Sequence, residues 1–191
     1  MSVKPQSMRP LDVLRNEHGL IRQFLDNLDL AVEKMESDEL PPREFFDKAL
    51  HFAHVFADDF HHIKEEHVMF VRLAQKNNGE LDGQIDALRH QHERARDHIS
   101  AINGALDGYS ANQPVQVGQV LESVAAYSSI LRNHIHKEDH VFYPLVEKTM
   151  SADEEQQLHD EFEKARSKAG SDVFEVNHKL VVDMGSMLVH L

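Results

Sequence analysis

Four long stretches of the sequence carry apolar residues at the spacing of an α-helix, and this pattern does most to set the fold. They cover roughly residues 10–36, 42–77, 80–107 and 114–149, and glycine, proline or serine residues separate them. Spacings of three and four residues place each apolar set on one helix face. At about 1.5 Å per residue, each stretch is as long as a helix of a four-helix bundle. The expected fold is therefore all-α, an up-down-up-down four-helix bundle.

Two shorter amphipathic helices are expected after the bundle. The segment SADEE at 151–155 has the form of a capped helix start. We expect residues 9–168 to form one bundle domain that includes the first extra helix, and residues 169–191 to form a C-terminal amphipathic helix. The apolar stripe of that last helix could pack across the bundle or meet a second subunit, which would give a homodimer. Its members are Val173, Val176, Leu180, Met184 and Met187.

Composition argues against several classes of partner and site. The net charge of −13 at pH 7 argues against binding to a nucleic-acid backbone or an anionic membrane. The chain has no cysteine, so any metal must bind to nitrogen and oxygen atoms. No run approaches the roughly 18 apolar residues of a membrane span, and the segment MSVKPQSMRP lacks the apolar core of a signal peptide. We expect a cytoplasmic protein.

Single histidines interrupt the apolar faces of these stretches. His18 lies among leucine and isoleucine residues in the first stretch, and His92 holds the same place in the third. In the fourth, His134 and Glu138 lie one turn apart on the face expected to be buried. The second stretch is ambiguous, because its two candidate faces are equally apolar. These faces carry His61 with Glu65 or His62 with Glu66.

An internal repeat decides between these two pairs. The segment HHIKEEHVMF at 61–70 aligns with HIHKEDHVFY at 134–143, and the shared pattern is H-x-x-K-E-[ED]-H-V-x-[FY]. In this alignment His61 matches His134, whereas His62 matches an isoleucine. The repeat therefore selects the first pair as the inward one.

The two upstream histidines follow the same duplication. The separation between His18 and His61 differs by a single residue from that between His92 and His134. The sequence thus predicts two similar helical hairpins, and each offers one lone core histidine and one H-x-x-x-E pair.

Such a set of buried imidazoles and carboxylates is costly to desolvate unless a cation holds it. A histidine and a glutamate at i, i+4 lie about 5 to 6 Å apart on one helix face, so both can reach one metal or two adjacent ones. Without sulfur the set suits iron, manganese or zinc, and glutamate bridging in a helix bundle favours two iron or two manganese ions. The candidate metal ligands are His18, His61, Glu65, His92, His134 and Glu138.

Four segments around these residues resemble the hemerythrin-like family, also called the HHE cation-binding domains. They are NEHGLI, FHHIKEEHVMF, QHERAR and NHIHKEDHVFYP, and the resemblance covers roughly residues 9–168. It implies two iron ions in a non-haem, oxo- or hydroxo-bridged di-iron centre that binds dioxygen or related small molecules. By motif match, the family's ligands fall on the six residues named above.

The sequence departs from the oxygen-carrying members of that family in two places. Those proteins have an H-x-x-x-H pair on the third helix, but here the residue four after His92 is Arg96. Their last motif is H-x-x-x-x-D, whereas the repeat and the helix face both favour Glu138 over Asp139. A four-histidine site leaves one more position open, which favours redox chemistry or sensing over reversible oxygen carriage.

We therefore expect a di-iron protein that binds or senses dioxygen, peroxide or nitric oxide at an open, carboxylate-bridged site. A di-iron oxidoreductase acting on peroxide or dioxygen is one alternative, and a metal storage or iron-handling protein is another. The sequence leaves open whether the protein is an enzyme.

Other polar residues lie near the expected ligands. His54 and Asp58 share roughly the face of the inward pair, and they either orient it or are ordinary packed or exposed polar residues. Tyr127 either lines the entrance or is a buried core residue, and the second interpretation is favoured. His62 is expected to be a neighbour of the site and not a ligand. Residues expected in solvent are Glu17, Glu93, His67 and His140.

Overall fold

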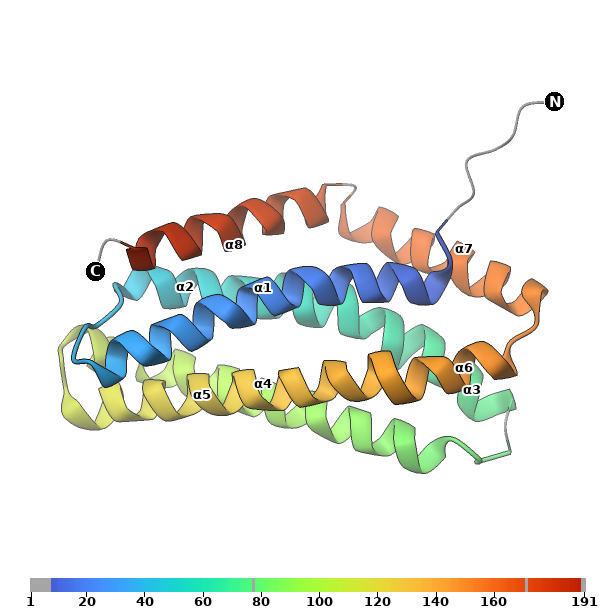
Figure 1. Cartoon of the computed structure of the whole chain (residues 1–191), viewed down its shortest axis with the longest axis horizontal. Helices are drawn as coiled ribbons and strands as arrows, with labels where there is room; N and C mark the ends of the chain where they lie inside the picture. The colour runs from blue at the N-terminus through green and yellow to red at the C-terminus, as the bar shows by residue number, and fades with distance from the viewer. Residues whose placement is uncertain (1–7, 77, 171, 190–191) are drawn as a thin grey trace.

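The computed structural model describes residues 8–76, 78–170 and 172–189, and within these ranges it contains helices and no strand (Figure 1). In chain order the elements are α1 (Pro10–Glu36), α2 (Arg43–Phe52), the π-helical segments η1 (Ala53–His62) and η2 (Lys64–Met69), α3 (Phe70–Lys76), α4 (Asp82–Ser110), α5 (Pro114–Lys137), the π-helical segment η3 (Glu138–Phe142), α6 (Tyr143–Thr149), α7 (Ala152–Ala169) and α8 (Val173–Val189).

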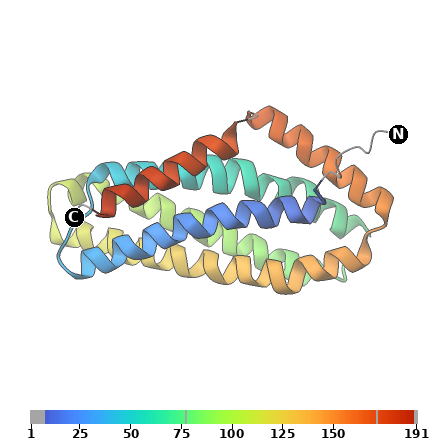
Figure 2. The same ribbon diagram turned by 45° about the horizontal axis from the view of Figure 1, so that its top comes forward.

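Four long rods run side by side and form the bundle (Figures 1 and 2). The first rod is α1, the second joins α2 through α3, the third is α4, and the fourth joins α5 through α6. The helix α4 packs along α5, and α1 also packs against α5. This arrangement confirms the all-α four-helix bundle expected from the apolar spacing.

The second and fourth rods change helix type where they carry the repeated motif. The segments η1 and η2 span most of the second rod's central part, and η3 begins at Glu138 in the fourth. A π-helix bonds each residue to the one five positions away, so its turns are wider than those of an α-helix. Residues that an ideal α-helix would point apart can therefore face the same side.

Two apolar clusters fill the bundle, one towards each end. Along α1, Leu14 belongs to the smaller cluster and Leu25 to the larger one, and His18 lies between them. The larger cluster includes Phe24, Phe46, Phe52, Phe56, Leu106 and Val124. The smaller cluster includes Phe70, Leu73, Leu88, Phe142, Val146 and Phe162. Burial of apolar area at about 25 cal/mol per Å² stabilises both ends, and the polar centre is held between them.

An extra layer, made of α7 and α8, covers one side of the bundle (Figures 1 and 2). The side chain of Ser151 caps α7 and accepts from the backbone of Glu154, which confirms the capped start expected there. The helix α8 packs on α1 and α2. Its buried apolar residues are Val181, Met184 and Leu188.

The stripe predicted for the last helix was wrong at one position. Val176 is 53% exposed, whereas Asn177 at the next position is buried. The buried line therefore runs one residue further along the helix than predicted. Val173, Leu180 and Met187 are partly buried against the larger cluster, so the stripe packs across the chain's own bundle.

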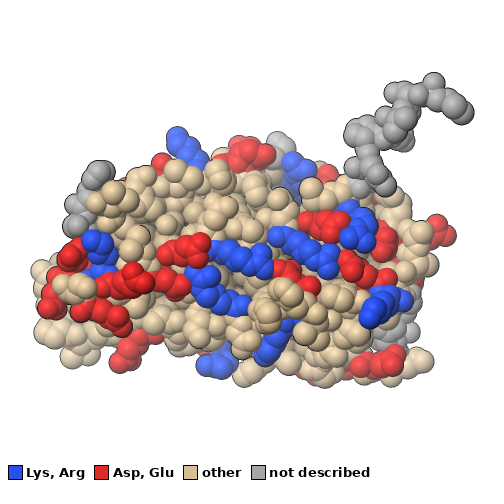
Figure 3. Space-filling view, in the orientation of Figure 1, with Lys and Arg blue, Asp and Glu red and all other residues tan. Residues whose placement is uncertain are grey.

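Acidic and basic side chains alternate over the face shown in Figure 3. Arg132 contacts Asp26 and Asp29, both at 2.6 Å, which ties α5 to α1. Exposed pairs of this kind contribute about 0 to 1 kcal/mol each. In the part of the chain that is described, no helix is both long and apolar enough to cross a membrane.

Candidate metal centre

The six residues predicted as ligands meet at the middle of the bundle, between the two apolar clusters. Each is at most 1% exposed. Each rod contributes at least one of them, because the apolar seams turn all four rods towards one point. The rods and their residues are α1 with His18, η1 and η2 with His61 and Glu65, α4 with His92, and α5 and η3 with His134 and Glu138.

Their side chains form two overlapping groups, and within each group one ligand atom per residue lies within 4.8 Å of the others. Glu65 belongs to both groups, so its carboxylate lies between two places where a cation could sit. One group is His18, His61, Glu65 and Glu138. The other is His62, Glu65, His92 and His134.

His62 enters the second group, which corrects the expectation that it is only a neighbour of the site. The residue is 4% exposed, and its ring stacks on that of His92 with centroids 3.7 Å apart. The inward position of His61 and Glu65 agrees with the repeat. The error arose from assuming α-helical turns, because the wider turns of η1 and η2 bring two successive histidines to the same side.

Five buried atoms at this centre have no hydrogen-bond partner among the described residues. Nε2 of His18 lies 3.2 Å from Oε2 of Glu138, and Nε2 of His61 lies 3.8 Å from Oε2 of Glu65, but neither contact makes a hydrogen bond. A buried polar atom left unpaired costs about 1 to 3 kcal/mol. The convergent lone pairs fit bound cations better than an internal hydrogen-bond network. The five atoms are Nε2 of His18, Nε2 of His61, Oε2 of Glu65 and both carboxylate oxygens of Glu138.

The electrostatics of the centre favour the same conclusion. Burial lowers the pKa of His61 and of His92 well below the ordinary value, so their rings are neutral and have a lone pair to donate. Burial and the charge of Glu138 raise the pKa of Glu65 far above its usual range. Burial also opposes ionisation of Glu138, but the attraction of His134 and His18 holds its pKa below the ordinary value. A cation between the two carboxylates would relieve their repulsion.

An outer ring of carboxylates orients the histidines. Nδ1 of His18 lies 2.9 Å from Oδ1 of Asp139, and Nδ1 of His92 lies 2.6 Å from Oε1 of Glu66. An ionised carboxylate only accepts hydrogen bonds, so each Nδ1 donates. Burial lowers the pKa of His92, so its Nε2 keeps a lone pair for the centre. Burial also disfavours the charged ring of His18, but Asp139 and Glu138 outweigh it and raise the pKa of His18, so a cation would displace a proton from its Nε2. Asp139, which the sequence ranked below Glu138 as a candidate ligand, therefore orients the candidate ligand His18.

Glu17 was expected in solvent, and this was wrong. It is 3% exposed, and its Oε2 lies 2.9 Å from Nδ1 of His61. Its other oxygen accepts from Lys64, which is also buried. Burial raises the pKa of Glu17 to about 7 and lowers that of Lys64. The position looked exposed in α1 alone, but His61 and Lys64 of the second rod contact it, and residues of α7 line the same cavity.

Of the other residues that the sequence singled out, some lie at or near the centre and others lie on the surface. Asp58 approaches the centre, since its Oδ1 lies 3.3 Å from Nδ1 of His62. Tyr127 is a buried core residue, and His54 is exposed. The sequence reasoning missed Tyr143, whose buried hydroxyl donates to Oε1 of Glu65. Glu93, His67 and His140 are exposed as expected.

Comparison with known proteins agrees with this geometry. A family model, the hemerythrin HHE cation-binding domain, matches residues 9–146. The chain belongs to this family. Uncharacterized proteins of Mycobacterium bovis and Mycobacterium tuberculosis are 28% identical to it over 157 residues, which is 81% of this chain. The chain spans only 59% of the length of these relatives. No solved structure matches it.

The outer ring of this HHE domain repeats the duplication of the motif. Glu66 of the second rod holds His92 of the third, and in the matching contact Asp139 of the fourth rod holds His18 of the first. Each of these carboxylates also pairs with an arginine. These arginines are Arg96 and Arg22, and each follows the lone core histidine of its hairpin, His92 or His18, by four residues. The repeat was therefore a usable signal for the outer ring.

Three matched positions break this symmetry, and all three contact the centre. His62 matches Ile135, so only one half supplies an extra imidazole. Tyr143 matches Phe70, so only one half supplies a hydroxyl to Glu65. In addition, Nδ1 of His134 faces the neutral amide of Gln91 at 3.2 Å, where the other half has a glutamate. The two groups of the HHE domain are chemically different.

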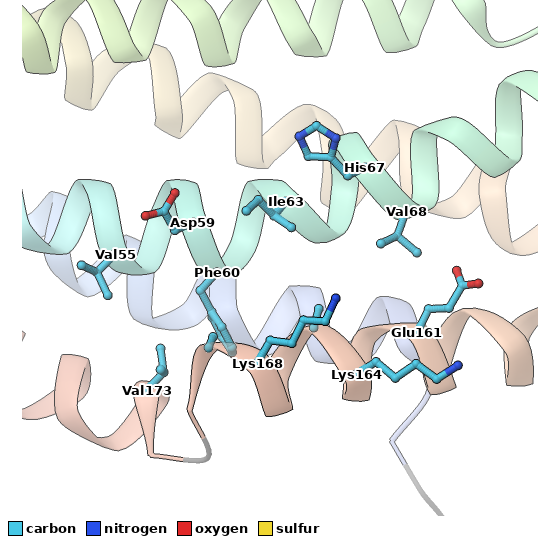
Figure 4. A pocket seen from close by; sticks show the side chains of 12 residues that line it. Val55, Asp59, Phe60, Ile63, His67, Val68, Glu161, Lys164, Lys168 and Val173 are labelled. Carbon is cyan, nitrogen blue, oxygen red and sulfur yellow. The ribbon is translucent and has the colours of Figure 1, made fainter.

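Cavities of different sizes lie at the centre and elsewhere in the molecule. A cavity of about 20 Å³ lies beside His62, Arg96 and Tyr127, which is room for about one water molecule. A larger cavity of about 530 Å³ reaches Glu17 and lies against α7. A groove of about 740 Å³ lies between η1, η2 and α7, with Lys164 and Lys168 along one side (Figure 4). No residue of the two candidate metal-binding groups lines that groove, so it is separate from the centre.

Proposed function

We propose that the protein is a non-haem di-iron protein that binds or senses dioxygen, peroxide or nitric oxide. The observation that carries this proposal is the pair of buried groups that share Glu65, with nitrogen and oxygen donors converging from all four rods. In this proposal His18 and His61 hold one ion. His62, His92 and His134 would hold the other. Glu65 belongs to both groups, and Glu138 belongs to the group of His18 and His61 with its Oε2 also 3.1 Å from Nε2 of His134.

The donor set supports iron. Imidazole and carboxylate ligands without thiolate suit iron, manganese or zinc, and two carboxylates shared inside a helix bundle favour a redox-active pair. Iron bound there would supply a change of oxidation state and a place for an oxygen-containing molecule. The protein supplies the neutral rings, the shared carboxylates and the exclusion of water by the apolar clusters on either side.

The ligand count supports binding of a small external molecule. Five imidazoles and two carboxylates, of which Glu65 belongs to both groups, do not fill the coordination shells of two octahedral ions. With His62 the centre has five histidines, as many as the oxygen-carrying members of the family. This count supports reversible binding, which the expected four-histidine set had disfavoured. Because the opening beside His62 has room for about one water molecule, the site suits diatomic molecules and peroxide better than large substrates.

An oxidoreductase acting on peroxide or dioxygen is the second candidate. Tyr143 favours it, because its buried hydroxyl donates to Oε1 of Glu65 and places a proton at the centre. Such a proton is useful when an oxygen–oxygen bond is broken and less useful for simple binding. The ring of Tyr143 also stacks parallel to that of His18, with ring centroids 5.6 Å apart.

One experiment separates the two candidates. Anaerobically iron-loaded protein is mixed in turn with dioxygen, nitric oxide and hydrogen peroxide, and the optical spectrum and oxidant consumption are followed. Binding or sensing predicts one spectral change at about one equivalent of oxidant. Sustained turnover that disappears in Glu65→Ala would favour the oxidoreductase. A native, redox-silent zinc protein that reacts with none of the three would contradict both.

A further inference from the structure

Arg96 on α4 contacts two carboxylates of the second rod at once. Its Nε lies 2.9 Å and 3.1 Å from the two carboxylate oxygens of Asp58, and its Nη2 lies 2.6 Å from Oδ1 of the same residue. The same Nη2 also lies 2.8 Å from Oε1 of Glu66. One guanidinium therefore bridges two acidic side chains that are eight residues apart in sequence.

Each of these carboxylates continues to a different histidine of the second group. Oδ1 of Asp58 lies 3.3 Å from Nδ1 of His62, and Oε1 of Glu66 lies 2.6 Å from Nδ1 of His92. In both cases the oxygen that faces the histidine also contacts Arg96. The orientation of two stacked imidazoles thus depends on a single side chain.

The geometry needs a planar fork with several donors. A guanidinium presents five N–H donors in a fixed plane, so it can hold both oxygens of Asp58 and still reach Glu66. A lysine ammonium is a point charge and cannot reproduce this contact to both residues. The carboxylates themselves are only partly buried, with side chains 25% and 16% exposed, so without the fork they could turn towards water.

We propose that Arg96 is a positioning residue that fixes His62 and His92 together, with both Nδ1 atoms hydrogen-bonded outward and both Nε2 atoms turned to the centre. Among the described residues, its counterpart Arg22 pairs with one carboxylate, Asp139, which contacts one histidine of the centre, His18. One half of the duplicated outer ring therefore orients two histidines and the other half orients one. The expected effect of Arg96 on metal binding rests on the proposed function. Its effect on the orientation of the two rings does not.

The direct test uses nuclear magnetic resonance of protein with ¹⁵N-labelled histidine, after treatment with chelator. In the wild type, His62 and His92 should show single Nδ1–H tautomers whose hydrogens exchange slowly with solvent. In Arg96→Gln, both signals should change to mixed tautomers and exchange at least about tenfold faster. Unchanged tautomers and exchange at both rings would overturn the proposal.

Matched variants separate positioning from a general loss of structure. Arg22→Gln should change the signal of His18 and leave those of His62 and His92 intact. Asp58→Asn should change His62 alone, and Glu66→Gln should change His92 alone. Arg96→Lys should not restore the wild-type signals. If Arg96→Gln altered every histidine of the centre equally, its role would be structural, and the positioning proposal would be wrong.

A metal titration then links the rings to the site. Arg96→Gln should weaken binding of the second Fe²⁺ equivalent about 10-fold to 100-fold, as is typical when an outer partner of a metal-binding histidine is lost. If the wild type binds no iron but the resonance results hold, the proposed function fails and the positioning role stands. If iron binding is normal and the resonance results fail, the positioning role fails and the proposed function stands.

Discussion

Nε2 of His92 lies 2.9 Å from Nε2 of His134 in the buried middle of the bundle. Nδ1 of His92 already donates to Glu66, so its Nε2 carries a lone pair. Two ring nitrogens at this distance can share at most one hydrogen. A cation that replaces this hydrogen would let both nitrogens donate their lone pairs, which is what the second metal position requires.

The first prediction concerns His62. Replacing it by alanine removes one of three imidazoles from the second group, so His62→Ala should lower iron occupancy from about two ions per chain towards about one. The measurement is iron content after anaerobic loading and gel filtration.

His67→Ala is the matched control, because His67 lies on the same rod but is exposed. It should keep the wild-type iron content. Full occupancy in His62→Ala would show that the original four-histidine set is complete without it.

The second prediction concerns Tyr143. In chelator-treated protein, Tyr143→Phe leaves Oε1 of Glu65 without its donor, and this should lower the free energy of unfolding by about 1 to 3 kcal/mol. Urea unfolding followed by circular dichroism measures the change.

Tyr109→Phe serves as the comparison, since that hydroxyl is also buried but donates to the carbonyl of Pro41, far from the centre. It should cost a similar amount of stability and leave the optical spectrum of the iron-loaded protein unchanged. The spectrum of iron-loaded Tyr143→Phe should shift. A spectrum identical to the wild type would argue against a role for Tyr143 at the centre.

The third prediction concerns how α7 is held to the bundle. Arg72 binds Glu161 of α7 through two contacts, of 2.9 Å and 2.5 Å, and the hydrogen bond with Arg72 lowers the pKa of Glu161. A lowered folded-state pKa stabilises the protein above the ordinary glutamate pKa, and this contribution is lost as the pH falls through the folded-state pKa.

Arg72→Gln should therefore reduce the free energy of unfolding at pH 7 by about 0.2 to 1 kcal/mol, because the pair is partly exposed to solvent. The difference between variant and wild type should shrink towards zero as Glu161 is protonated. Unfolding by urea across a pH series measures it. A difference that grew on acidification would contradict this assignment.

Much of the fold could be read from the sequence because each rod has a continuous apolar face. His18, His92 and His134 could be placed for the same reason, since they interrupt faces that are otherwise aliphatic. His61 and Glu65 needed the repeat, because the second rod's own periodicity selects neither register.

The features of the centre that could not be predicted from the sequence depend on departures from ideal helices and on contacts between rods. His62 turns inward because η1 and η2 have wider turns than the α-helix that spacing arguments assume. Glu17 and Lys64 are buried together by the packing of neighbouring helices, which no single helix face reveals. The Arg96 contacts join residues of two rods, so neither rod's pattern contains them.

The central claim is a two-metal centre that depends on the shared carboxylate of Glu65. Its most direct test is metal analysis of anaerobically iron-loaded protein, with Glu65→Ala beside the exposed control Glu93→Ala. The wild type and Glu93→Ala should each hold about two iron ions per chain and develop near-ultraviolet absorption on oxidation, and Glu65→Ala should lose both ions. One iron ion or fewer in the wild type, or full occupancy in Glu65→Ala, would contradict the account.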